Sequence, residues 1–125
     1  MKLVISGGRN IDVGSQKILR IINCISTEFD LEITELVVGC CLTGVDQTVR
    51  DYVLPTWEGA SKIFTADWDK HGRAAGPIRN REMAEYADFL LAFWDGRSRG
   101  TKSMINEMYK LAKPVKIVKI ERTNG

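Results

Sequence analysis

The chain has 125 residues, of which 44% are apolar and 27% are charged, and its formal net charge is +2. This length and composition predict one globular domain over residues 1–125 and exclude a two-domain enzyme with a cleft between its lobes. No apolar run reaches the roughly 20 residues that cross a bilayer, and the small net charge does not favour a membrane surface. We therefore expect a soluble cytoplasmic protein without a membrane partner.

The cysteines and the histidine offer little for redox or metal chemistry. Cys24, Cys40 and Cys41 form no C-x-x-C pattern, and His71 is the only histidine. An odd number of cysteines without that spacing predicts neither a disulfide framework nor a zinc site. We expect reduced thiols and no metal ion.

Short apolar runs alternate along the chain with longer segments in which apolar residues recur every three or four positions. Strict alternation of strands and helices predicts a parallel sheet with right-handed connections and helices on both faces. The runs typical of strands lie at 3–5, 35–39, 62–66, 89–94 and 115–120, and the segments typical of helices lie at 18–29, 43–54, 77–87 and 101–112.

The composition of each run indicates its place in the sheet. The runs at 3–5, 36–38 and 89–93 are uninterrupted and apolar, as in strands buried on both faces, whereas the run at 115–120 contains lysines and suits an edge. With strands three and five at the edges, we predict a three-layer Rossmann-like α/β sandwich with a five-stranded parallel sheet in the order 3-2-1-4-5. Such sheets bind ligands at the carboxyl ends of the strands where the order reverses, between strands one and four.

The loop after the first strand contains paired glycines. Ser6, Gly7, Gly8 and Arg9 follow one another, so that the backbone can approach a ligand closely and a guanidinium can donate to a phosphate. The alternative is a tight strand-to-helix turn that needs only the flexibility of glycine.

The loop after the fourth strand opens the last helix. Free N–H groups, the helix dipole and positive charge make such an N-terminus a site for an anion. In the alternative, Ser98 or Thr101 only caps the helix and the basic side chains face solvent. The candidate residues in this loop are Asp95, Ser98, Gly100, Thr101 and Lys102.

The loop after the second strand is a glycine-containing turn into a helix. Gly39 and Gly44 frame it, and Thr43 and Asp46 have the spacing of a capping box. Capping is one explanation of Asp46. In the other, Asp46 accepts a hydrogen bond from a sugar hydroxyl or orients the glycine loop.

The long loop at 66–81 combines an aromatic residue with several basic ones. Trp68 can stack on a ring, and Arg79 and Asn80 lie in the first turn of the next helix, at the same end of the sheet. In the alternative, Trp68 fills the edge of the core and the basic side chains are solvated.

Four motifs occur in order along nearly the whole chain: GGR, VVGCCLTGVD, ADWDKHGRAAGPIRN and FWDGRSRGT. Together they resemble the SLOG superfamily of Rossmann-like nucleotide-binding domains, and most closely its small YspA-like branch. The chain departs from the usual pattern at Val45, where the family commonly has alanine, and at Cys40 and Cys41, where small residues are usual. The resemblance implies a nucleotide or its derivative as ligand, without fixing a reaction.

Two better-known relatives within this resemblance indicate which functions it implies. The lonely-guy phosphoribohydrolases cleave the N-glycosidic bond of nucleoside monophosphates, and their catalytic glutamate closely follows a Gly-Thr that matches Gly100 and Thr101. Here Lys102 stands next, and Glu107 comes nearly two turns later. The DNA-processing A proteins, which bind single-stranded DNA, are similar in their SGGR-like, GVD-like and RNR elements.

The leading hypothesis is binding of an ADP-ribose-like, NAD-derived or cyclic nucleotide by a sensor or sequestering protein that requires no cofactor. The alternatives are a hydrolase of N-glycosidic or phosphate bonds, with Asp95, Asp46 or Glu107 as the catalytic carboxylate, and a protein that binds single-stranded nucleic acid. A homo-oligomer is compatible with each. The predicted ligand-binding residues are Ser6, Gly7, Gly8, Arg9, Gly39, Gly44, Asp46, Trp68, Arg79, Asn80, Asp95, Ser98, Gly100, Thr101 and Lys102.

Overall fold

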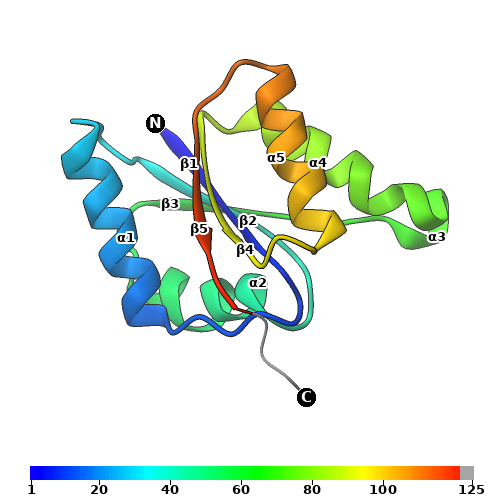
Figure 1. The fold of residues 1–125 in the computed structure, drawn as a ribbon, viewed down its shortest axis with the longest axis horizontal. Helices are drawn as coiled ribbons and strands as arrows, with labels where there is room; N and C mark the ends of the chain where they lie inside the picture. Colours follow the sequence, from blue (N-terminus) through cyan, green and yellow to red (C-terminus); the bar gives the residue numbers. More distant parts are fainter. Residues whose placement is uncertain (122–125) are drawn as a thin grey trace.

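Five parallel strands form one sheet in the computed structural model, which describes residues 1–121 (Figure 1). The sheet order is β3-β2-β1-β4-β5, and every neighbouring pair is parallel. The predicted fold class and strand order are therefore confirmed. The strands are β1 (Lys2–Gly7), β2 (Glu35–Gly39), β3 (Ala60–Phe64), β4 (Phe89–Trp94) and β5 (Val115–Lys119).

Helices cover both faces of the sheet, which gives the three layers (Figure 1). One face carries α1 (Ser15–Glu28) and α2 (Val45–Thr48), and the other carries α4 (Ala75–Tyr86) and α5 (Arg99–Lys110). A short helix, α3 (Trp68–His71), leads through a 3-10 turn into α4. Within residues 1–121, no helix combines the length and apolarity that crossing a membrane requires.

Alternate residues of the central strands point into two separate cores. Leu3 and Ile5 pack with Ile18 and its neighbours in α1, whereas Val4 packs with Met104 and its neighbours in α5, and all of these side chains are fully buried. Burying each such side chain stabilises the fold by about 1.5–3 kcal/mol. Both helix layers are thus fixed to β1, and the loops that follow β1 and β4 are held at one end of the sheet.

The second crossover departs from the continuous helix predicted at 43–54. Only Val45–Thr48 is α-helical, and the chain then widens into a π-helical turn at Val49–Val53 and closes in a 3-10 turn at Leu54–Thr56. Val45, Val49 and Val53 are all fully buried on the same core. Because these valines are four residues apart, a wider turn keeps them on one face as well as an α-helix would.

Several other elements begin or end one to three residues from their predicted bounds, and the third strand and the helix predicted at 77–87 are two of them. The third strand is Ala60–Phe64 instead of 62–66, because it is an edge strand whose pairing with β2 sets its register, and most of its residues are exposed. The fourth helix begins at Ala75, two residues before Pro77. Pro77 still lies in the first turn, where its missing N–H would have no partner within the helix.

Candidate ligand-binding site

A cavity of about 360 Å³ opens at the carboxyl ends of β1 and β4, where the sheet order reverses. Its volume is in the range of pockets for small molecules. All four loops that the sequence pointed to contribute to its wall. The predicted residues that line it are Ser6, Gly7, Gly8, Arg9, Asp46, Trp68, Arg79, Asn80, Asp95, Ser98, Gly100 and Thr101.

The N-terminus of α5 forms one wall of this cavity. Ser98 is the N-cap, and its Oγ accepts the N–H of Thr101 at 3.5 Å and lies 3.3 Å from Thr101 Oγ1. Oδ1 of Asp95 accepts the N–H groups of Arg97 and Ser98, both at 2.8 Å, which holds the preceding loop in place. The predicted cap is confirmed, and the positive end of the helix dipole lies at the cavity beside the exposed Arg99.

The glycine loop after β1 packs against the start of α2. Gly44 has a φ of +78°, and a Cβ placed on it would overlap the carbonyl oxygen of Gly8. Oγ1 of Thr43 donates to the carbonyl of Arg9 at 3.2 Å. The predicted capping box is therefore wrong, because Thr43 binds the neighbouring loop and Gly44 is the N-cap of α2.

Asp46 places a buried carboxyl group in the cavity wall, with the residue only 5% exposed. Its Oδ2 accepts the N–H of Cys41 at 3.2 Å, so the side chain orients the loop after β2. Gly39 makes room for it, because a Cβ there would lie 2.8 Å from Asp46 Oδ2 and 3.3 Å from Arg79 Cζ. Arg50 fixes the same loop by donating to the carbonyls of residues 39 and 41 at 3.0 and 2.6 Å.

Burial raises the pKa of the Asp46 carboxyl above its ordinary value, although the Cys41 N–H, Arg79 and Arg50 act in the opposite direction. The native state therefore binds this proton more tightly than the unfolded chain does. The stability that protonation gives is complete below the ordinary pKa of 3.8 and is lost as pH rises through the raised pKa. A carboxyl group with a raised pKa in a cavity wall is a candidate functional residue.

We expect the Asp46→Asn variant not to lose this stability as pH rises, because the amide does not ionise. The variant's free energy of unfolding should therefore improve relative to that of the native protein as pH rises from about 4 to about 7. Urea denaturation of both proteins at several pH values measures the difference. A difference that is constant with pH, or that moves against the variant, would contradict the raised pKa.

Arg79 brings a half-buried guanidinium to the cavity wall. Its Nη1 lies 3.9 Å from the Sγ of Cys41 and 4.0 Å from that of Cys40, and its Nη2 donates to Asn80 Oδ1 at 3.5 Å. Its Nε is buried, and no acceptor within residues 1–121 takes a hydrogen bond from it. Since thiols are weak acceptors, an anion in the cavity would be a stronger partner for this guanidinium.

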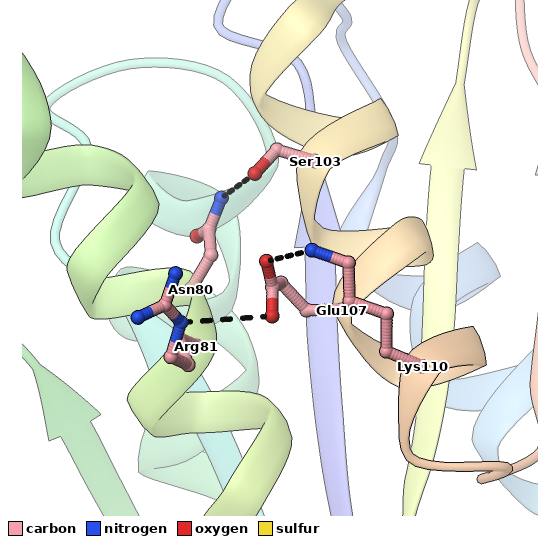
Figure 2. A network of polar contacts seen from close by, with 5 residues as sticks. All are labelled: Asn80, Arg81, Ser103, Glu107 and Lys110. Carbon is pink, nitrogen blue, oxygen red and sulfur yellow. Dashed lines mark hydrogen bonds and ion pairs between the residues drawn. The ribbon is translucent and has the colours of Figure 1, made fainter.

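Asn80 links α4 to the start of α5. The residue is 4% exposed, and its Nδ2 donates to the carbonyl of Gly100 at 3.2 Å and to Oγ of Ser103 at 3.4 Å. Figure 2 shows the side chain pointing from α4 toward Ser103 on α5. Asn80 therefore positions the N-terminus of α5 relative to the cavity.

Glu107, one of the candidate catalytic carboxylates, lies outside the cavity wall. It forms ion pairs with Lys110 at 3.2 Å and with Arg81 at 3.9 Å (Figure 2). Its place in the third turn of α5 puts it beyond the end of the helix that faces the cavity. Asp46 and Asp95 are the candidate carboxylates that do line it.

Trp68 covers the cavity from α3 and is 48% exposed, so the alternative that it fills the edge of the core is wrong. Gly76 lies beside its ring, because a Cβ on this glycine would be 3.4 Å from Trp68 Cη2. An exposed indole at a cavity mouth is available for stacking on a ring of a ligand.

The predicted and observed linings of the cavity differ in two ways. Gly39 and Gly44 are packing residues behind the wall, and Lys102 is exposed on α5 outside it. Of the residues that were missed, helical spacing could have found Met83, four positions after Arg79. The predicted loops, residues 6–10, 39–46, 67–80 and 95–102, also contain the lining residues Asn10, Cys41, Gly76, Pro77 and Arg99, whereas Met83 and Ser103 lie outside these loops.

Comparison with known proteins gives one partial match. The Gene 61 protein of Mycobacterium phage D29 is 46% identical over 55 residues, which cover 43% of this chain and 44% of that protein. The chain thus matches less than half the length of this relative. No protein family and no solved structure matches the chain.

Proposed function

We propose that this chain binds a nucleotide-derived small molecule, of the ADP-ribose-like, NAD-derived or cyclic nucleotide class, and acts as a sensor or a sequestering protein. The observation that carries the proposal is that two sources of positive electrostatic potential line one cavity. The capped N-terminus of α5 forms one part of the wall, and Arg79, whose Nη1 has only the thiols of Cys40 and Cys41 as acceptors within residues 1–121, forms another. Both favour a phosphate over a neutral ligand.

The other parts of the cavity suit the rest of a nucleotide. The exposed indole of Trp68 offers a stacking surface for a base, and Asp46 offers carboxylate oxygens to sugar hydroxyls. The resemblance to the SLOG superfamily supports the same class of ligand, because its GGR and GT elements, residues 7–9 and 100–101, line this cavity. We also propose that the chain is a single domain of a cytoplasmic protein, and a homo-oligomer is compatible with this function.

Release of the bound molecule tests the proposal directly. Purified protein is heated, and the small molecules in the supernatant are identified by mass spectrometry and returned to fresh protein in a calorimeter. We expect a nucleotide derivative that binds with a shallow dependence on salt, as one or two phosphate contacts require. A steep fall of affinity with salt, together with binding of single-stranded DNA, would favour the nucleic-acid hypothesis instead.

We expect the protein not to hydrolyse nucleoside monophosphates efficiently. Cleavage of an N-glycosidic bond builds positive charge on the sugar, which a carboxylate must stabilise or use to activate water. Glu107 is paired with Arg81 and Lys110 away from the cavity, and Asp95 holds the loop before α5. Incubation with AMP, a cytokinin-type monophosphate and NAD, followed by chromatography of the free base, measures the reaction. Base release above about 1 per second would contradict this expectation.

A further inference from the structure

A second cavity of about 390 Å³ adjoins the first. Three residues of the loop after β2 line the second cavity and not the first, namely Cys40, Leu42 and Thr43. Leu42 is 84% exposed, so this side of the cavity is a shallow apolar rim on the surface. The two cavities share part of their lining and are therefore neighbours.

The wall that the two cavities share contains two guanidinium groups. Arg9, Cys41, Trp68 and Arg79 line both of them. Arg9 is exposed and Arg79 is half-buried, so one positive charge lies at the surface and the other lies deeper at the same junction. The indole of Trp68 lines both cavities. A ligand that occupies both cavities would therefore bring its negative charge near these two arginines, with one uncharged part in each cavity.

We propose, resting on the nucleotide-binding function above, that the ligand has two halves joined through a phosphate or pyrophosphate linker, one half in each cavity. A mononucleotide would fill one cavity and leave the contacts of the other unused. Each half then contributes part of the affinity, because linking two binding groups makes the second contact intramolecular. ADP-ribose and its two halves, AMP and ribose 5-phosphate, are the probes that separate these cases.

The cysteines provide reporters for each cavity. Cys40 lines the second cavity, Cys41 lines both, and Cys24 lies exposed on α1, away from either lining. Alkylation with iodoacetamide, located by tandem mass spectrometry, gives the reaction rate of each thiol in one experiment. Cys24 serves as the internal control, because a ligand in either cavity does not cover it.

We expect saturating ADP-ribose to slow alkylation of both Cys40 and Cys41 by about tenfold, and AMP to leave the rate at Cys40 unchanged. We also expect calorimetry to show ADP-ribose binding at least about tenfold more tightly than either half. If Cys40 reacts at the free rate under ADP-ribose, or if AMP matches ADP-ribose in affinity and protection, the two-half ligand is wrong and the nucleotide site stands. If none of the three molecules binds or protects any thiol, the two-half ligand is wrong and so is the proposed binding of an ADP-ribose-like molecule.

A charge pair at Leu42 gives a second, independent measurement. Leu42→Asp and Leu42→Lys remove the same exposed side chain, so both variants keep the fold and differ in the charge at the rim of the second cavity. At low salt we expect the lysine variant to bind ADP-ribose about tenfold more tightly than the aspartate variant, whereas adenosine, which carries no phosphate, should bind both variants equally. Equal affinities for ADP-ribose in the two variants would overturn the placement of its linker at this junction.

Discussion

Replacing Gly44 with alanine is expected to lower the free energy of unfolding by about 3 kcal/mol or more. Two causes add at this residue. Its φ of +78° lies in a region that side chains other than glycine rarely adopt, which costs about 1–3 kcal/mol. In addition, the new Cβ would overlap the carbonyl oxygen of Gly8 and lie 2.8 Å from Arg9 Cα, so the backbone of one loop would have to move.

Two other glycines separate these causes. Gly96 also has a positive φ, of +84°, but nothing lies within 4 Å of its Cβ position, so Gly96→Ala reports the backbone strain alone. Gly100 has open space in the first turn of α5, and Gly100→Ala should be neutral or slightly stabilising. Urea denaturation ranks the three variants. A loss at Gly44 no larger than that at Gly96 would show that the two loops do not meet as closely as described.

The contact at Gly44 explains why part of the site could not be read from the sequence. Local spacing indicated a capping box between Thr43 and Asp46, since these residue types three apart commonly cap a helix. In the folded chain Thr43 instead reaches the loop after β1, and Asp46 turns back to Cys41. Thr43 and Asp46 thus each bind a residue outside the motif that they form in the sequence. The spacing of residues alone does not reveal such contacts.

The fold itself was largely predictable, because it depends on where apolar residues recur. The uninterrupted runs at β1, β2 and β4 require burial on both faces, and this requirement is sufficient to place the other two strands at the edges. The edge strand β3 lacks that signal, since most of it is exposed, and its predicted bounds were shifted by two residues. Burial thus determined which strands lie at the edges, whereas pairing with β2 determined the register of β3.

The largest effect on ligand binding is expected from Arg79 and Thr101. A charge-assisted hydrogen bond to a bound phosphate contributes about 1.5–3 kcal/mol, so Arg79→Ala should weaken binding of the nucleotide by about ten- to a hundredfold. Thr101→Ala should have a similar effect, because it removes the hydroxyl that lies 3.3 Å from Ser98 Oγ at the end of α5 that faces the cavity. Titration calorimetry with the molecule released by heating measures both variants.

Arg81 is the matched control, since it lies on the same helix as Arg79 but pairs with Glu107 outside the cavity. Arg81→Ala should bind the ligand with native affinity. Arg79→Lys should bind with intermediate affinity, because an ammonium keeps the charge but loses the planar pair of donors. Urea denaturation of each variant checks that a lost affinity is not a lost fold. If Arg79→Ala and Thr101→Ala both fold and bind as tightly as Arg81→Ala, the guanidinium and the helix N-terminus do not hold a phosphate, and Arg79 serves only to neutralise the buried carboxyl of Asp46.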